Sequence, residues 1–148
     1  MKRLLLSAAV ILVVSGAALQ AQAGESTTRV ERQHKPDPLL EGRLPQTQEQ
    51  LVKVLRTGTP VMQAQAVQTI RELEQMFPTY PFDSLLVPLE EKLKSEDADS
   101  IVRLLSALAL DELHSDAGDA VIREVADSSK DEGLRTLCKA LMIRSEYR

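Results

Sequence analysis

The chain is 148 residues long, which suits a single domain, and its 22 acidic residues outnumber its 18 basic residues. The net charge of −4 argues against nucleic acid and anionic membrane surfaces as partners, because both attract basic proteins. Its one cysteine, Cys138, excludes an intramolecular disulfide framework, so the fold must be held together by packing.

The first 23 residues have the organisation of a secretory signal peptide. Two basic residues precede an apolar run from Leu4 to Leu19, and Ala21 and Ala23 put small residues where a signal peptidase cuts. The run has about 16 residues, fewer than the roughly 20 that a membrane span requires. We therefore predict cleavage near Ala23/Gly24 and a periplasmic or secreted protein without a stable membrane anchor. An uncleaved anchor is the alternative.

A flexible leader is predicted for residues 24–45. This segment contains several prolines and glycines and has no apolar periodicity. Pro36 and Pro38 flank Asp37 and favour extended backbone in the residues before them, so no helix is expected there.

Residues 46–148 are predicted to form one all-α domain, because no stretch alternates apolar and polar residues as a strand would. Caps and prolines divide it into six expected helices, which begin at Thr47, at Pro60, near Phe82 or Asp83, near Ile101, after Ser115 or Asp116, and after Ser128 or Ser129. Apolar spacing predicts which side chains face inward. For the second helix these are Met62, Ala66, Ile70, Leu73 and Phe77.

The third and fourth helices are the most informative pair. Pro88 lies inside the third helix and is expected to bend it or to delay its start. The fourth is apolar on almost every side, since only Arg103 and Ser106 are polar between Ile101 and Leu110. Such a helix must be covered by several neighbours.

The pattern of these two helices recurs 32 residues later, in the fifth and sixth helices, where Arg135 takes the place of Arg103. The segment from Phe82 to His114 resembles a HEAT repeat. The residues that carry the resemblance are Val87, Pro88, Leu89, Leu93, Asp97 or Asp99, Val102, Arg103, Ala107, Leu110 and Leu113. The match is partial for Asp116–Arg144 and weak for Gln46–Phe77.

The resemblance implies a short right-handed α-solenoid of about three helical hairpins that serves as a scaffold for protein interactions. It also implies a ladder of ion pairs between neighbouring repeats, formed by Asp99 and Asp131 with Arg103 and Arg135. The alternative is that the aspartates cap helices and the arginines are solvated.

No catalytic, cofactor-binding or metal-binding set of residues emerges from the sequence. His34 and His114 are far apart, with no cysteine or carboxylate at metal-ligand spacing. The adjacent pairs Glu90-Glu91 and Asp111-Glu112 are expected to be solvated. We therefore predict a protein that is not an enzyme.

Three aromatic residues, Phe77, Tyr80 and Phe82, lie close together between the second and third helices. They form either a hydrophobic plug between the two helices or an exposed anchor for a partner. Cys138 follows the apolar residues of the sixth helix and is expected to be a small buried hydrophobe; an exposed thiol that bridges two chains is the alternative.

The predicted function is that of an exported interaction scaffold that binds another protein, with no nucleic acid and no cofactor. The alternatives are a small subunit of, or accessory factor to, an envelope enzyme complex, and a structural oligomer that stacks on itself. The candidate interaction surface consists of Gln63, Gln68, Glu72, Tyr80, Phe82, Arg103, Ser106, Arg135 and Lys139.

Overall fold

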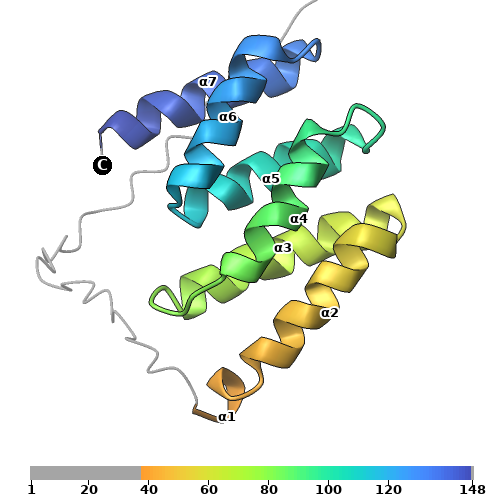
Figure 1. The fold of residues 1–148 in the computed structure, drawn as a ribbon, viewed down its shortest axis with the longest axis vertical. Helices are drawn as coiled ribbons and strands as arrows, with labels where there is room; N and C mark the ends of the chain where they lie inside the picture. The colour runs from red at the N-terminus through yellow and green to blue at the C-terminus, as the bar shows by residue number, and fades with distance from the viewer. Residues whose placement is uncertain (1–37, 148) are drawn as a thin grey trace, which may run out of the picture. The chain divides into compact units, whose positions relative to one another are not determined.

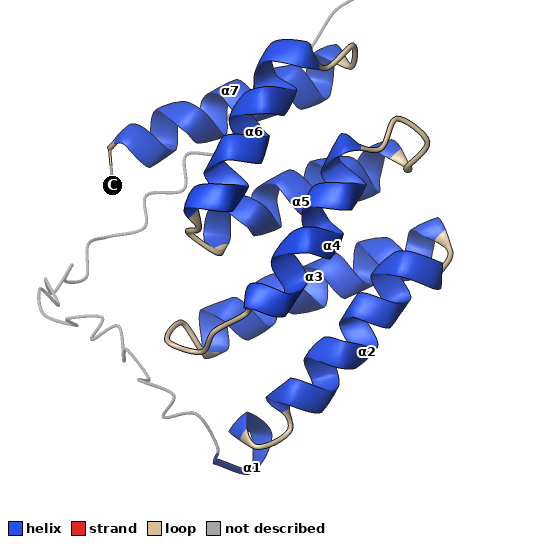
Figure 2. Cartoon of the chain, in the orientation of Figure 1, coloured by secondary structure: helices blue, strands red, loops and turns tan. Residues whose placement is uncertain are grey.

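The structure is a computed structural model that describes residues 38–147. Within this range the chain is all-helical, without strands, which confirms the predicted fold class (Figure 1 and Figure 2). The helices are α1 (Pro38–Glu41), α2 (Leu44–Thr57), α3 (Pro60–Met76), α4 (Asp83–Lys94), α5 (Ser100–Glu112), α6 (Asp116–Ser128) and α7 (Glu132–Glu146). No helix among the described residues is both long enough and apolar enough to cross a membrane. The predicted signal peptide and residues 24–37 of the predicted leader lie outside the described residues.

Six of these helices form two layers (Figure 1). One layer contains α2, α4 and α6, and the other contains α3, α5 and α7. Each helix of the first layer contacts the helix that follows it in the chain, and α2 contacts α4 as α4 contacts α6. The second layer is linked in the same way, through contacts of α5 with both α3 and α7.

Helix α5 lies at the centre of this arrangement. It contacts α3, α4, α6 and α7, which confirms the expectation that the most apolar helix is covered by several neighbours. Val102, Ala107 and Leu110 are fully buried. Ile101, in the first turn, is 59% exposed and lies outside the core.

The N-terminal end of the helical region differs from the prediction. A short helix begins at Pro38, where none was expected, because proline is well suited to the first position of a helix, which needs no N–H donor. Helix α2 begins at Leu44 rather than at Thr47, since Leu44 is buried in the core. Thr47 lies inside α2, where its hydroxyl donates to the carbonyl of Arg43 at 3.0 Å, so it is not the cap.

Four later helices have N-caps of the usual kind, in which a side-chain oxygen accepts from a backbone N–H of the first turn. The caps of α3, α5, α6 and α7 are Thr59, Asp99, Ser115 and Asp131. The cap of α7 is thus Asp131 rather than either of the serines before it. Helix α4 begins at Asp83 and contains Pro88 in its interior, so the proline does not delay its start.

The inward face of α3 follows the prediction from Ala66 onward and differs from it in the first turn. Met62 is 47% exposed, whereas Gln63 is only 8% exposed and Val67 is fully buried. The Gln63 side-chain amide donates to the carbonyl of Leu55 at 3.0 Å. This carbonyl lies in the last turn of α2, where the helix itself supplies no donor. A polar side chain therefore occupies the core side of α3 because it completes the end of α2.

Replacing Gln63 by alanine is expected to lower the free energy of unfolding by about 1–2 kcal/mol, because the buried Leu55 carbonyl loses its donor. The matched control is Gln65→Ala, which changes the same residue type at an exposed position of the same helix and should have almost no effect. Urea unfolding followed by circular dichroism compares the two. Equal losses for both variants would contradict the assigned role of Gln63.

Candidate protein-binding site

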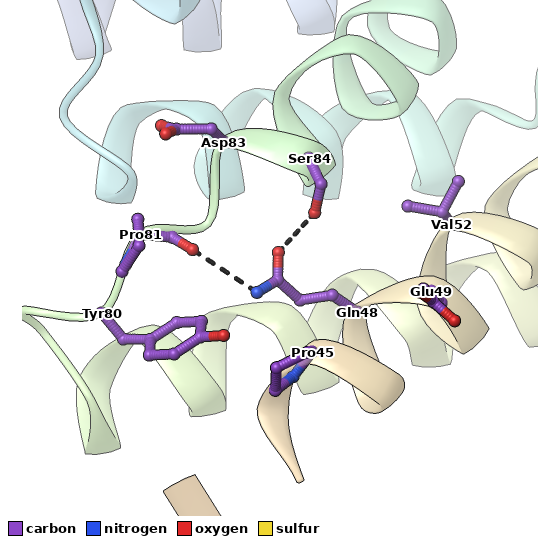
Figure 3. A pocket seen from close by; sticks show the side chains of 8 residues that line it. All are labelled: Pro45, Gln48, Glu49, Val52, Tyr80, Pro81, Asp83 and Ser84. Atoms are coloured by element: carbon purple, nitrogen blue, oxygen red, sulfur yellow. Dashed lines mark hydrogen bonds between the residues drawn. The ribbon is translucent and has the colours of Figure 1, made fainter. Parts of the chain in front are cut away.

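A pocket of about 570 Å³ lies where the first half of α2 meets the turn between α3 and α4 (Figure 3). We call it the Tyr80 pocket. It is lined by Pro45, Gln48, Glu49 and Val52 from α2, by Tyr80 and Pro81 from the turn, and by Asp83 and Ser84 from the start of α4. Its volume falls in the range of ligand-binding pockets, and most of its lining residues are exposed.

Gln48 fixes the inner side of this pocket. Its side chain is buried, its Nε2 donates to the carbonyl of Pro81 at 3.4 Å, and its Oε1 accepts from the Ser84 hydroxyl (Figure 3). One amide thus links α2 to both the turn and α4. The donor and the acceptor of this amide are thus both used within the chain, which stabilises the contact between the three segments.

Gln48 was not among the residues singled out from the sequence, although a signal was present. It lies at helical spacing from three buried leucines of α2, namely Leu44, Leu51 and Leu55. A glutamine within an apolar stripe requires buried hydrogen-bond partners, and these are 33 and 36 residues away in the chain. The position of Gln48 on the apolar face of α2 could indicate that its side chain is buried and hydrogen-bonded, but it could not indicate which segments the side chain joins.

The aromatic turn divides into core and surface residues. Phe77 and Phe82 are buried and belong to the core, as the plug interpretation predicts. Tyr80 is only partly buried; its ring packs on Phe82, with centroids 5.2 Å apart and a tilt of 58°, and it lines the pocket. In Figure 3 the hydroxyl end of Tyr80 points toward Pro45. Tyr80 is therefore the aromatic residue of this turn that a partner can reach.

The electrostatic character of the site is acidic. Glu49 and Asp83 are exposed, and the Asp83 carboxylate points away from Gln48 (Figure 3). Asp83, Tyr80 and Pro81 also line a second pocket of about 130 Å³, on which Glu74 borders. Partial burial raises the pKa of the Glu74 carboxyl, while the charge of His114 opposes this rise. Among the described residues, neither pocket is lined by a lysine or an arginine.

The other residues of the predicted interaction surface do not form one site. Gln63, Phe82 and Ser106 are buried, so they are core residues and not surface residues. The Ser106 hydroxyl has no hydrogen-bond partner among the described residues. Gln68 and Glu72 are exposed and line a separate pocket of about 330 Å³ on α3.

The remaining predicted surface residues are on α5 and α7. Arg103 donates from Nε to the carbonyl of Leu93 at 3.2 Å, and Arg135 donates to the carbonyl of Ser129 at 3.3 Å. Each arginine therefore links its own helix to the segment that precedes that helix in the sequence. Lys139 is exposed.

The ion pairs between neighbouring helices are not those expected from the HEAT resemblance. Asp99 and Asp131 act as helix caps, and their carboxylates make no ion pair with Arg103 or Arg135 within residues 38–147. The pairs that join helices of the same layer are Arg71–Glu112 at 2.6 Å, Lys94–Glu124 at 2.6 Å, Arg56–Glu91 at 4.0 Å, and Arg144–Asp111. Asp111 is fully buried, so the prediction that it is solvated is wrong; its position opposite Arg144 on α7 compensates the burial of its charge.

Cys138 is fully buried, as predicted for a small hydrophobe at this position. Burial raises the pKa of its thiol to about 11, and the nearby Arg103 partly opposes the shift. The neutral thiol is therefore the form present at physiological pH. Within residues 38–147, no group of three or more histidine, cysteine, aspartate or glutamate side chains could hold a metal ion.

Two results are expected for Cys138. Ellman's reagent should react with the folded chain about a hundredfold or more slowly than with the chain unfolded in guanidinium, because the sulfur is covered. Stability should fall as the pH rises from about 9, the ordinary pKa of the thiol, to about 11, because the unfolded chain loses this proton first. Cys138→Ala should abolish that part of the decline. Rapid labelling of the folded chain, or an unchanged decline in the variant, would contradict the buried position.

The Tyr80 pocket thus combines an accessible aromatic ring, two prolines, a hydrogen-bonded amide and exposed carboxylates. These features come from the structure of this chain and not from similarity to another protein. Comparisons of the chain with protein-family models, with curated protein sequences and with solved structures found no significant match.

Proposed function

We propose that the chain is a non-catalytic, HEAT-like helical-repeat protein that binds another protein at the Tyr80 pocket. The two layers support a solenoid interpretation, because each hairpin covers an apolar face of the next, as in stacked helical repeats. The single observation that carries the binding proposal is the pocket itself. It combines an accessible tyrosine with a rigid base at the end of the stack where α2 lies.

The pocket suits a protein partner for two physical reasons. Tyrosine is enriched among the residues that contribute most to protein interfaces, because it offers a large amphipathic surface with few rotatable bonds. The Gln48 amide holds α2 and the turn in place, so little conformational entropy is lost on binding.

The expected export of the chain defines where the partner is found. The apolar run before Ala21 and Ala23 supports a signal peptide that is cleaved near Gly24. The partner would then be a protein of the cell envelope or the extracellular space. N-terminal sequencing of the chain recovered from the periplasm or the medium tests this part of the proposal, and a chain that retains its N-terminal methionine would contradict it.

Affinity capture with matched variants tests the binding proposal. Proteins from an envelope extract are captured at low salt by the unchanged chain, by Tyr80→Ala and by Lys139→Ala. We expect a partner whose recovery falls about fivefold or more with Tyr80→Ala, because removing an interface tyrosine costs over about 1 kcal/mol. Lys139→Ala, an exposed change on α7, should leave recovery unchanged. Loss of the partner with Lys139→Ala alone would place binding on the other layer and overturn the proposal.

Self-association is a second candidate, because apolar side chains are exposed near both ends of the helical region. Leu39 on α1 is 78% exposed, and Ile143 on α7 is 59% exposed. Stacked helical repeats usually cover such ends with polar caps. Sedimentation of the chain tests this candidate: dimers or larger species at micromolar concentration would support it, and a strict monomer would exclude it.

A further inference from the structure

The apolar part of the Tyr80 pocket is made of rings. Pro45, Pro81 and Tyr80 provide two pyrrolidine rings and one phenol, and Val52 adds an aliphatic side chain. Tyr80 is the one aromatic ring among the described lining residues. Proline-containing segments pack on exposed aromatic rings, and their extended polyproline II conformation is already formed in the free peptide and loses little entropy on binding. The composition of the wall therefore favours an extended segment with prolines over an amphipathic helix.

The charges around the pocket favour a positively charged ligand. Glu49 lines the Tyr80 pocket, Asp83 lines both this pocket and the smaller one, and Glu74 borders the smaller one. Neither Glu49 nor Asp83 forms an ion pair within residues 38–147, although Asp83 faces the positive end of α4. Because no lysine or arginine of residues 38–147 lines either pocket, the surface attracts cations and repels acidic segments.

From these two observations we infer that the docking element of the partner is an extended, proline-containing segment with basic side chains. Its prolines would lie against Tyr80 and the two pocket prolines, and its lysine or arginine side chains would reach Glu49 and Asp83. This inference rests on the proposed function of the Tyr80 pocket and names the chemistry of its ligand. The chain's own leader is a competing occupant, because residues 24–37 contain Arg29, Arg32 and Lys35 followed by a proline.

Three synthetic decapeptides separate the contributions of charge and of proline. The probes are (Arg-Pro)5, (Glu-Pro)5 and (Arg-Gly)5, each titrated into the ¹⁵N-labelled full chain and followed by two-dimensional NMR. We expect (Arg-Pro)5 to shift the amide signals of Gln48, Tyr80 and Ser84, with weaker shifts for (Arg-Gly)5 and none for (Glu-Pro)5. Binding should weaken as sodium chloride is raised, because ions screen the exposed carboxylates.

Charge variants locate the contact. Glu49→Gln should weaken (Arg-Pro)5 binding about two- to fivefold, the range for one exposed ion pair. The control Glu132→Gln removes an exposed carboxylate at the start of α7 that lines neither pocket and should leave binding unchanged. Equal binding of (Glu-Pro)5 and (Arg-Pro)5, or equal effects of the two variants, would overturn the inference.

The outcomes also separate this inference from the proposed function. If no decapeptide shifts the pocket signals but partner capture still depends on Tyr80, the ligand chemistry is wrong and the binding site stands. If capture does not depend on Tyr80 either, both proposals fail. If replacing Arg29, Arg32 and Lys35 by glutamine shifts the pocket signals in the absence of any peptide, the leader occupies the site and a partner segment is excluded as its primary ligand.

Discussion

Replacing Leu110 by alanine is expected to lower the free energy of unfolding by about 3–5 kcal/mol. Leu110 is fully buried on α5, the helix that contacts both of its neighbours in its own layer and two helices of the other layer. A cavity at this position cannot be filled by the movement of one neighbour, because the surrounding helices are held by one another. Urea unfolding at constant temperature measures the effect.

The control for this substitution is Ile101→Ala on the same helix. Ile101 is 59% exposed in the first turn of α5, so its truncation should change stability by about 0.5 kcal/mol or less. Both substitutions shorten an aliphatic side chain, and they differ in burial. Similar losses for the two variants would contradict the central position of α5.

Replacing Phe82 by alanine is expected to cost about 3–4 kcal/mol, whereas Tyr80→Ala should cost about 1 kcal/mol. Phe82 is buried in the core, and Tyr80 is partly exposed and packs on it in a tilted ring contact. Thermal unfolding of the two variants measures the difference.

The opposite order of the two effects would mean that Tyr80, and not Phe82, supports the core. The small effect expected for Tyr80→Ala matters for the binding test, because this variant must remain folded for lost capture to report on the interface.

The helical periodicity predicted α4 well and α3 less well, for a physical reason. In α4 the fully buried residues Leu85, Leu89 and Leu93 recur every four residues, the spacing of an apolar helical face. In α3 the predicted face included Met62, but Gln63 lies inward because its amide completes the end of α2. A pattern that scores residues by polarity cannot anticipate a buried glutamine whose partner is a backbone carbonyl of another helix.

Three of the four helix starts with a local cap were predicted, whereas the cap of α7 was assigned to a serine before Asp131 and the start of α2 was missed because packing decides it. Thr59, Asp99 and Ser115 bond to amides two or three residues ahead, so the sequence alone indicates them. Helix α2 instead extends back to Leu44, which the core covers. Thr47 and Gln50 have the spacing of a capping box, but spacing cannot show that an earlier leucine is already buried.

The sequence indicated the accessible aromatic residue of the candidate site, but not the second segment that forms the pocket with it. The cluster of Phe77, Tyr80 and Phe82 marked the turn, and the structure assigns the accessible position to Tyr80. The other wall of the pocket comes from α2, more than 30 residues earlier in the chain, through the bond from Gln48 to Pro81. The same limit applies to the ion pairs between helices, such as Arg71 with Glu112, which are 41 residues apart.

Hydrogen–deuterium exchange of the chain with and without its captured partner tests the central claim most directly. The claim is that the Tyr80 pocket is the docking site. It predicts that the partner slows exchange in residues 45–52 and 80–84, the two segments that form the pocket, and leaves residues 132–146 of α7 unchanged. Slower exchange in α7 or along α3, with no change in residues 80–84, would contradict it.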